Sequence, residues 1–556
     1  MKQFVIKNSS ILFYSFWFSS LLIQAFFTEL TFDESYYWMY SKELAWGYFD
    51  HPPAIALMIK IGYSIFKNEL GVRLLPIFAS TLTLFLWEKI MKPKNLKVFY
   101  LLILSVGILH FIGFFALPDN PLLLATAFYF LCLKQFLVTA NLKNGLLLGF
   151  ASSLLILSKY HGILILVFTL LPNLSLLKKK SFWFVVFSFV LFLIPHILWQ
   201  IHNDFPSVKY HLFERSVASY KINFTLEYLL TQPFILGPFT GILFFIAHIK
   251  IKSKDSFEKS LKYLFWGGYF FFFLMSFKGR VEAHWTLFVV FSGLYFGYEY
   301  IAEITKKKKI IYKLFYISIA LIFLVRILIS LDVENKYNTV LAKITKQFHQ
   351  KESMLAIKKE AKDLPVAFMN SYQKASLYSF YTQATSFSLN NIWGRKNQFD
   401  IWNYEQRLRG EKIFLIPNYK TTGYDSILAF PKIKYKTISN FQSYSKIKII
   451  PNNIIEKANS LDTISVKIRF SNIQKEFIDL EKNKKYPAVL YYQFIEGKYP
   501  IKTNIVKKLT NKDLEKELEL NVVTPNKKGV YRLCFSIMSG DLPHSINSEK
   551  YKIEIR

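Results

Sequence analysis

Apolar runs long enough to cross a bilayer follow one another through the first 331 of the 556 residues and then stop. A membrane-spanning α-helix needs about 20 mostly apolar residues, and short polar breaks separate these runs in the same way as loops separate spans. The predicted spans are residues 11–30, 70–91, 97–116, 121–140, 145–158, 161–177, 181–201, 226–249, 260–277, 284–302 and 310–331. The sequence therefore predicts a polytopic α-helical membrane protein with about eleven transmembrane helices.

Lysines mark every second loop between the predicted spans. Lys92, Lys143, Lys178, Lys250 and Lys309 lie in loops on one side of the membrane if the N-terminus is cytoplasmic. The positive-inside rule favours this orientation. We therefore expect a multi-pass protein of the cell (inner) membrane whose alternate loops, and whole C-terminal region, are extracytoplasmic or periplasmic.

The net charge of +32 at first suggests a nucleic-acid partner. The basic residues are scattered and many lie in short loops between spans, so no nucleic-acid partner is indicated, and membrane lipids are the expected electrostatic neighbours. Of the two cysteines, Cys132 lies within a span and Cys534 near the end of the chain. No Cys/His cluster is present in the sequence, so nothing indicates a zinc site or redox chemistry.

The C-terminal region divides by pattern into two parts beyond a transmembrane domain of residues 1–331. Residues 332–430 mix a Lys-rich helical segment with short apolar strands, which predicts an α/β region. Residues 431–556 alternate apolar and polar positions between Asn-Lys and Gly turns, which predicts a β-sandwich. The clearest strand candidates are residues 366–369, 413–416, 465–470, 488–494 and 530–537.

The loop after the first span is rich in acidic and aromatic residues. Asp33 and Glu34 stand at its start, followed by Tyr36 and Tyr37, and Asp50-His51 comes later in the same loop. Acidic residues at the mouth of an apolar helix are costly and tend to be functional. The alternative is a solvated loop end with an interfacial aromatic belt, which this position alone would also explain.

A second acid, Asp119, lies in the turn Leu117-Pro118-Asp119-Asn120-Pro121. By itself this is a good turn and helix start, and it gains functional weight only together with Asp33. Outer cationic residues complete the set: Arg73, Lys159, Lys278 and Arg280. Each one alone is expected to snorkel toward head groups, but together with two acids they describe a phosphate site beside a carboxylate base.

An ordered series of short motifs resembles the lipid-linked glycosyltransferases of the GT-C superfamily, in the branch of protein O-mannosyltransferases and the lipid A aminoarabinose transferase. The resemblance covers most of residues 10–300 and fades after about residue 430. Its motifs are Asp33-Glu34-Ser35-Tyr36-Tyr37-Trp38, Gly47-Tyr48-Phe49-Asp50-His51-Pro52-Pro53, Glu69-Leu70-Gly71-Val72-Arg73-Leu74-Leu75-Pro76, Pro118-Asp119-Asn120-Pro121, Ser158-Lys159-Tyr160 and Arg280-Val281-Glu282-Ala283-His284-Trp285.

The resemblance implies an inverting transferase that moves a hexosyl or pentosyl group from a polyprenyl-phosphate donor to a lipid-linked glycan, lipid A or a protein. It implies Asp33 as the base or acceptor-positioning carboxylate, with Glu34 beside it and Asp119 across the cavity. Donor or phosphate contacts are carried over to five residues: Arg73, His51, Lys159, Lys278 and Arg280. Asp50, Tyr36 and Tyr37 are expected to form the substrate loop.

One departure from the family pattern is at His51. Members similar to the aminoarabinose transferase carry an acid-Lys-Pro triplet where this chain has Asp50-His51-Pro52. A histidine in the phosphate-facing position would make that contact dependent on pH. No cofactor is expected, and a divalent metal is not implied, because carboxylates beside cationic residues need no metal to explain them.

Two other classes of function remain open on the sequence. A transporter or flippase for a lipid-linked saccharide would also need many spans, but such proteins usually carry polar residues at the bilayer midplane and paired broken helices. A binding protein that holds envelope glycan with its outer sandwich would need one anchoring helix rather than about eleven.

Overall fold

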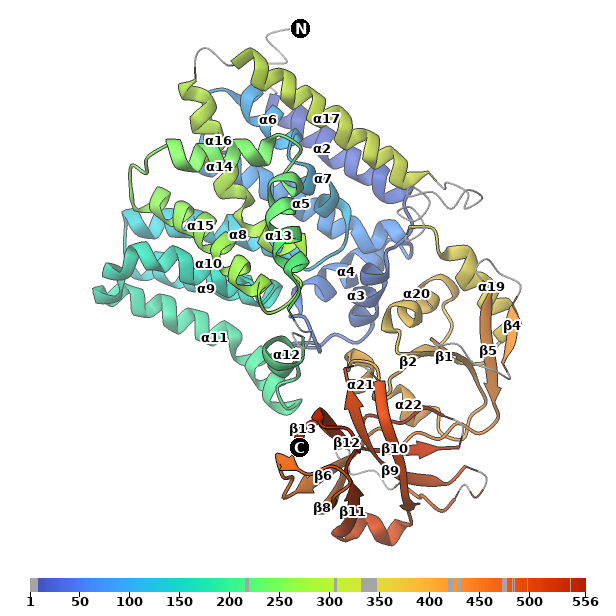
Figure 1. Ribbon diagram of the computed structural model, residues 1–556. Coiled ribbons are helices and arrows are strands. Elements are labelled where there is room, and N and C mark those ends of the chain that lie inside the picture. The colour runs from blue at the N-terminus through green and yellow to red at the C-terminus, as the bar shows by residue number, and fades with distance from the viewer. Residues whose placement is uncertain are drawn as a thin grey trace. The chain divides into compact units, whose positions relative to one another are not determined.

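The computed structural model describes residues 9–215, 220–304, 308–331, 348–418, 424–427, 432–472, 478–482, 484, 486–497, 499–540 and 542–556. The chain forms two compact units, Met1–Gln350 and Lys351–Arg556. The described residues of the first unit are helical, and the second combines helices with three sheets (Figure 1). The predicted fold class, a helical membrane part followed by α/β and β-sandwich structure, is confirmed.

Among the described residues, five helices are long and apolar enough to cross a membrane. They are α2 (Ser9–Phe26), α5 (Glu69–Met91), α8 (Asp119–Val138), α11 (Lys180–His202) and α17 (Lys308–Ser330). Two bent pairs raise the number to seven if each pair is one span. The pairs are α6 (Leu96–Leu104) with α7 (Gly107–Phe114), bent by 72°, and α13 (Ile222–Ile235) with α14 (Thr240–Lys250), bent by 93°.

Further helices complete the bundle. They are α4 (Ala54–Ile65), α9 (Leu142–Ser158), α10 (Gly162–Leu170) continued by the 3-10 helix η1 (Leu171–Lys178), α15 (Ser256–Ser276), and η3 (Ala283–Val289) continued by α16 (Val290–Glu303). Every predicted span therefore coincides with a helix or a helix pair. Several of these helices are shorter than a full bilayer crossing, which a hydropathy pattern alone does not reveal.

The two bent helix pairs meet at their breaks. Thr240 donates from its hydroxyl to the carbonyl of Ser105 at 2.9 Å, and the amide of Gly107 donates to Leu236 at 3.2 Å. Gly237 adopts φ +141°, and a Cβ there would lie 2.4 Å from the Ser105 carbonyl oxygen. Non-helical backbone at membrane depth must be satisfied inside the protein. Here each break supplies partners for the other.

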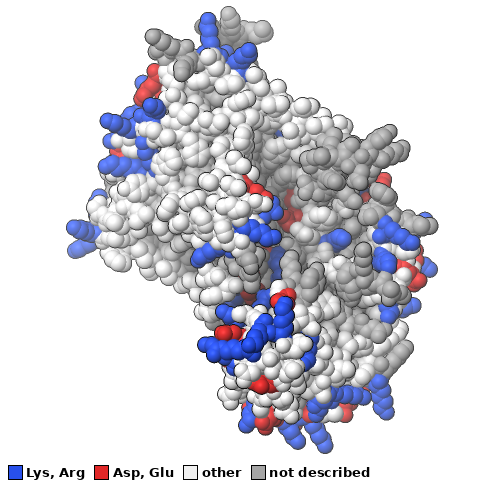
Figure 2. Space-filling model, in the orientation of Figure 1, with Lys and Arg blue, Asp and Glu red and all other residues white. Residues whose placement is uncertain are grey.

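The surface of the bundle is apolar where lipid would contact it. Trp183, Phe187 and Leu198 are exposed along α11, and Figure 2 shows wide uncharged areas on the helical unit with Lys and Arg gathered at its edges. The inner side of α11 approaches α9 so closely that a Cβ on Gly149 would lie 2.3 Å from the Val185 carbonyl oxygen. Small residues allow such close helix packing in membranes.

Short helices occupy the loops that were predicted to face outward. They are α3 (Phe32–Lys42), α12 (Pro206–Lys209) and the π-helix η2 (Tyr210–Glu214). Thr31 begins α3 through a capping box with Glu34, since its hydroxyl accepts from the Glu34 amide and the Glu34 carboxylate accepts from the Thr31 amide. This cap fixes the direction of α3 directly after the first span.

The second unit begins with an α/β layer. Its sheet has the order β2-β1-β3-β5-β4, with β1 parallel to β2 and β3 and the other pairs antiparallel. The elements are α19 (Lys351–Ala361), β1 (Val366–Met369), α20 (Tyr372–Thr382), β2 (Ser386–Leu389), α21 (Gln398–Ile401), α22 (Tyr404–Arg407), β3 (Ile413–Ile416), β4 (Asp425–Ile427) and β5 (Ile433–Ile438).

A β-sandwich completes this unit. One sheet has the order β10-β9-β12-β13-β7 and the other β11-β8-β6. The strands are β6 (Ile447–Asn452), β7 (Lys457–Ala458), β8 (Thr463–Asn472), β9 (Ala488–Glu496), β10 (Tyr499–Lys508), β11 (Leu518–Val523), β12 (Gly529–Ser539) and β13 (Tyr551–Ile555). Apolar side chains such as Val466, Phe494 and Phe535 fill its core.

The expected strands all appear, and all pairs but β13 with β7 are antiparallel. The three predicted domains, 1–331, 332–430 and 431–556, stay a prediction.

Candidate active site

A buried ion pair links α3, in the loop after α2, to α5. Arg73 donates to both oxygens of Glu34, from Nε to Oε1 and from a terminal nitrogen to Oε2, each at 2.7 Å. Both side chains are fully buried. Bidentate pairing of this kind is the strongest geometry for a guanidinium and a carboxylate.

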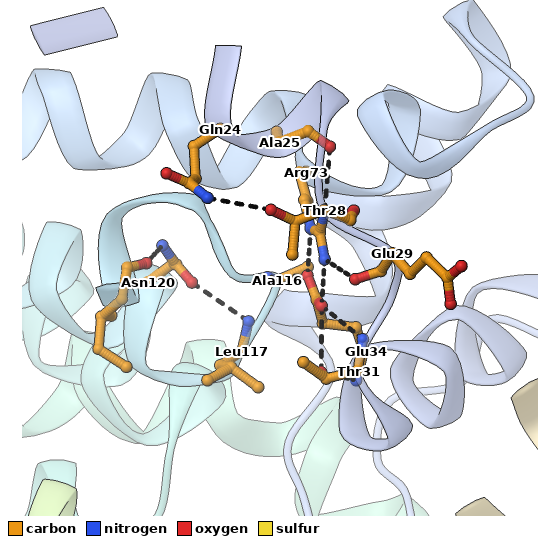
Figure 3. A network of polar contacts seen from close by, with 11 residues as sticks. Gln24, Ala25, Thr28, Glu29, Thr31, Glu34, Arg73, Ala116, Leu117 and Asn120 are labelled. Atoms are coloured by element: carbon orange, nitrogen blue, oxygen red, sulfur yellow. Dashed lines mark hydrogen bonds and ion pairs between the residues drawn. The ribbon is translucent and has the colours of Figure 1, made fainter. Parts of the chain in front are cut away.

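The remaining hydrogen-bonding groups of this pair are also used, as Figure 3 shows. Arg73 donates to the backbone carbonyls of Ala25, Thr28 and Glu29 at 2.5–3.1 Å. Glu34 accepts from the amide of Ala116 at 2.9 Å and from Thr31. The pair therefore joins the end of α2, the start of α3, α5 and the segment before α8.

A second buried ion pair joins Asp119 and Lys159. The Lys159 ammonium lies 2.8 Å from both carboxylate oxygens of Asp119. Asp119 is the first residue of α8, and Lys159 directly follows the last residue of α9. Because α8 and α9 are consecutive helices that pack against each other (Figure 1), the start of the first lies beside the end of the second. Asp119 also lies at a helix N-terminus, where a negative charge is favourable.

Helix α3 carries a stripe of polar side chains toward this region. Asp33, Tyr36, Tyr37 and Tyr40 share one face by their spacing. Tyr37 is hydrogen-bonded through its hydroxyl to His51 Nε2 at 3.1 Å, and Tyr40 donates to Asp50 at 2.5 Å. Asp33 is exposed in the first turn. The helix thus connects Asp33 to the Asp50-His51 loop.

Further basic groups surround Asp119 and Lys159. His51 and His284 interact electrostatically with Asp119, and His161 interacts with Lys159 and His284. His211 donates from Nε2 to the Asp50 carbonyl at 3.0 Å, and Arg215 stacks over Trp285 at 4.2 Å. We call these residues, His51, Asp119, Lys159, His161, His211, Arg215 and His284, the basic cluster. It can accommodate an anionic group.

Burial decides the charge state of one member of this cluster. Burial lowers the pKa of His51 to about 3, and the nearby Lys159, Arg215 and His211 reinforce the shift while Asp50 opposes it. His51 is therefore neutral at pH 7. The same loop contains a carboxylate beside a tyrosine: burial and the Asp50 charge raise the pKa of Tyr40 well above its usual value, so Tyr40 stays a hydrogen-bond donor.

Comparison with known proteins gives a consistent result. Residues 50–199 match the family of dolichyl-phosphate-mannose-protein mannosyltransferases. The fold matches a crystal structure of ArnT from Cupriavidus metallidurans in the apo state, with TM-score 0.55 and 10% identity over 78% of this chain and 98% of that one. It also matches ArnT from the same organism bound to undecaprenyl phosphate, with TM-score 0.53 and 12% identity over 76% of this chain and 97% of that one. No curated protein sequence matches the chain.

The chain has the fold of these two ArnT structures. Within this fold, the segment that matches the mannosyltransferase family contains Asp50, His51, Arg73, Asp119 and Lys159. Both buried ion pairs thus have at least one member in the matched segment. His161 lies in the matched segment as well, whereas His211, Arg215 and His284 come from later in the chain.

Two of the residues predicted to contact phosphate, Lys278 and Arg280, lie in another segment of the helical unit. Arg280 is 64% exposed in its side chain and lies 3.7 Å from Glu227 and 3.9 Å from Glu282. Lys278 is exposed as well. Among the described residues, neither contacts the Asp119–Lys159 pair. Both lie in the short segment that leads to His284, which interacts electrostatically with Asp119.

Four members of the basic cluster were not singled out from the sequence: His161, His211, Arg215 and His284. His161 and His284 stand within motifs that were recognised, two residues after Lys159 and four after Arg280. These two motifs drew attention to their lysine and arginine, but not to their histidines. His211 and Arg215 lie in a loop of ordinary composition, and only tertiary contact places them here.

The described residues include no group of three or more His, Cys, Asp or Glu side chains that could hold a metal ion. The histidines of the basic cluster come from separate segments, with Lys159 and Arg215 among them. Cationic neighbours of this kind suit an anion better than a metal cation.

Proposed function

We propose that this chain is an inverting glycosyltransferase that transfers a hexosyl or pentosyl group from a polyprenyl-phosphate donor to an extracytoplasmic acceptor. The observation that carries the proposal is the buried Asp119–Lys159 pair inside a basic cluster, in a chain with the GT-C fold. A transferase of this type needs one group that takes the acceptor proton and positive groups that receive the departing phosphate. The acceptor is a lipid-linked glycan, lipid A or a protein.

The donor's phosphate fits the basic cluster by charge. Lys159 forms an ion pair with Asp119, the Arg215 guanidinium lies over Trp285, and His51 takes the place of the lysine in the family's acid-Lys-Pro triplet. One of the matching structures is an ArnT bound to undecaprenyl phosphate, which supports a polyprenyl phosphate as the carrier. The sugar's C1–O bond to phosphate breaks as a bond from the acceptor oxygen to C1 forms, and the electron pair remains on the phosphate.

We assign different roles to the acids. Asp33, exposed at the start of α3, is the base or acceptor-positioning carboxylate. Asp119 holds Lys159 toward the donor phosphate. Glu34 and Arg73 are bonded to each other and to backbone, so we now propose that they position α3 rather than contact substrate. Tyr36 and Tyr37, with Asp50, line the substrate loop, and Lys278 and Arg280 remain candidates only for the rim.

The placement of lysines supports an active site at the outer face of the membrane. The C-terminal unit would then share the compartment of the acceptor. Its β-sandwich is a candidate for acceptor recognition, because catalysis by the helical unit does not require a second core of that size. Deleting residues 431–556 tests this: loss of transfer to the natural acceptor alone indicates recognition, and loss with a small acceptor as well indicates a structural requirement.

One observation favours a transporter or flippase, since two bent helix pairs lie in the membrane unit. In transporters, groups freed by broken helices bind substrate or ions. Here Thr240, Ser105, Gly107 and Leu236 satisfy one another at the crossing. We therefore favour the transferase and treat the bends as packing.

Mass spectrometry of envelope lipids and glycoproteins from a deletion strain tests the function, because one missing sugar identifies donor and acceptor together. Complementation with Asp33→Asn should leave expression and membrane insertion intact and abolish transfer. Asp363→Asn, an exposed acid in the other unit, is the matched control and should restore the sugar fully. Turnover retained in Asp33→Asn would remove that residue from the mechanism, and an unchanged envelope in the deletion strain would count against the transferase itself.

A further inference from the structure

Four of the ten histidines of the chain belong to the basic cluster. They come from four separate segments: His51, His161 and His284 lie near Lys159 and Arg215, and His211 lies near His51 and His161. A site that only needed fixed positive charge would use lysine and arginine. Histidine adds a group that can be neutral in one state of the site and charged in another.

Two of these imidazoles have unused nitrogens. Nδ1 of His51 and Nδ1 of His161 are buried and have no hydrogen-bond partner among the described residues. His51 is already held through Nε2 by Tyr37. A buried nitrogen without a partner costs free energy, which a bound acceptor oxygen would recover. The two nitrogens thus mark places where a ligand's oxygen atoms can be received.

The charged and titratable groups around these imidazoles are mixed in sign. Asp50, His211, Lys159 and Arg215 act on His51, and Lys159, His211, Arg215 and His284 act on His161. His284 faces Lys159, Asp119, Glu282 and Arg215, and Tyr160 faces Asp50. Because Lys159 and Arg215 already bring positive charge to the cluster, protonation of an imidazole without a bound anion is unfavourable. An additional negative charge would reverse that balance.

The proposed reaction creates such a charge. The donor is a phosphodiester with one negative charge, whereas the released lipid phosphate is a monoester whose second ionisation has a pKa of about 6. The acceptor hydroxyl loses one proton as its oxygen bonds to the sugar. The phosphate gains one negative charge as the C1–O bond breaks. One proton and one negative charge therefore appear together.

We propose that a histidine of the basic cluster gains one proton in the product state, equivalent to the proton that Asp33 takes from the acceptor, so that the product lipid phosphate is held as a dianion against an imidazolium. This inference rests on the proposed function and adds to it a proton-coupled product state. Donor binding needs no proton uptake, but product binding does. The product is then held more weakly as the pH rises, and release of the lipid phosphate is linked to loss of the proton.

The test measures binding of undecaprenyl phosphate to the full-length protein in detergent. Titration calorimetry in two buffers of different ionisation enthalpy, at pH 7.5–8.5, should give uptake of about one proton per lipid, and the Kd should rise about tenfold per pH unit. The methyl diester of undecaprenyl phosphate should bind with almost no proton uptake. A ³¹P chemical shift of the bound monoester should report a dianion.

Variants separate this cluster from other histidines. His51→Gln and His161→Gln should each reduce the pH dependence of the Kd to less than about threefold per unit. His202→Gln, at an exposed position at the end of α11, is the matched control and should retain the full dependence. Thermal unfolding confirms that each variant is folded, and where one is not, the other carries the test.

Three results would overturn the inference: no proton uptake by the unaltered protein, the same uptake in both histidine variants, or a ³¹P shift showing that the phosphate itself holds the proton. Transfer assays keep this outcome separate from the proposed function. If sugar is transferred but no proton is taken up on binding, the proposed function stands and the proton coupling is wrong. If binding is coupled to proton uptake but no sugar is transferred, the histidine site is supported and the proposed transferase function is contradicted.

Discussion

The two buried ion pairs formed by residues of the predicted outer loops differ in how completely their bonds are used. In the Glu34–Arg73 pair, both carboxylate oxygens and the guanidinium nitrogens are bonded to each other, to backbone or to Thr31. In the Asp119–Lys159 pair, the ammonium is bonded to one carboxylate among the described residues. Nearby, Nδ1 of His51 and Nδ1 of His161 have no hydrogen-bond partner among the described residues. The first pair is complete without a ligand, whereas the second leaves polar capacity unused.

This difference separates structural from functional charge. A fully bonded buried pair fixes the geometry of its neighbours, and its loss leaves an uncompensated charge in a dry site. A pair with unused donors can exchange part of its bonding for a ligand. Both pairs contain acids that the motif series marked as functional. Only their surroundings distinguish them.

The largest expected effect on stability follows from opening the complete pair. Arg73→Met leaves the Glu34 carboxylate buried without its partner, so we expect a loss of about 3–5 kcal/mol in the free energy of unfolding. Thermal unfolding of the purified protein in detergent measures this. The double variant Glu34→Gln with Arg73→Met should recover part of the loss. A single variant as stable as the unaltered protein would contradict the structural role.

An intermediate effect on stability is expected at the second pair. Asp119→Asn keeps an acceptor near Lys159 but removes the charge, and we expect a loss of about 1–3 kcal/mol in the free energy of unfolding. Transfer should fall by a factor of about 10²–10⁴. Sugar transfer and thermal unfolding are measured on the same preparation. If Asp119→Asn loses as much stability as Arg73→Met and the protein that stays folded transfers sugar normally, both pairs have a structural role only.

The smallest effect is expected at Arg280, which serves as the reference for both pairs. Its ion pairs with Glu227 and Glu282 are long and exposed, and exposed pairs contribute little to stability. Arg280→Gln should change the free energy of unfolding by less than about 0.5 kcal/mol. Transfer should be nearly unchanged. A large loss of transfer at unchanged stability would restore the predicted donor contact at this residue.

Much of the fold could be predicted because it depends on local pattern. The predicted span 181–201 corresponds to α11 (Lys180–His202), and the predicted strands 366–369 and 413–416 coincide with β1 and β3. Hydrophobic length and alternation are short-range properties of a chain, so they can be recognised without knowing what packs against them. The bends between α6 and α7 and between α13 and α14 were missed, because apolar composition continues through both breaks.

The candidate site could be predicted only in part, for the opposite reason. The motifs named Asp119 and Lys159, but their contact depends on the antiparallel packing of α8 and α9. Glu34 and Arg73 are 39 residues apart, and nothing local indicates that each would satisfy the other. His211 and Arg215 lie in a loop whose composition resembles many others. Long-range contacts of this kind are made by the fold.

The sequence by itself thus determined the membrane-spanning character of the first 331 residues, the mixed and β structure that follows, and the motifs among which the site would lie. Those properties depend on hydropathy and spacing along the chain. Only the tertiary structure decided which buried charges have all their hydrogen bonds made within the protein and which can still bind a ligand. This depends on the partners that packing brings to each buried group. The Glu34 carboxylate accepts from five donor groups and is part of the scaffold, whereas Asp119 pairs with one lysine inside a group of histidines.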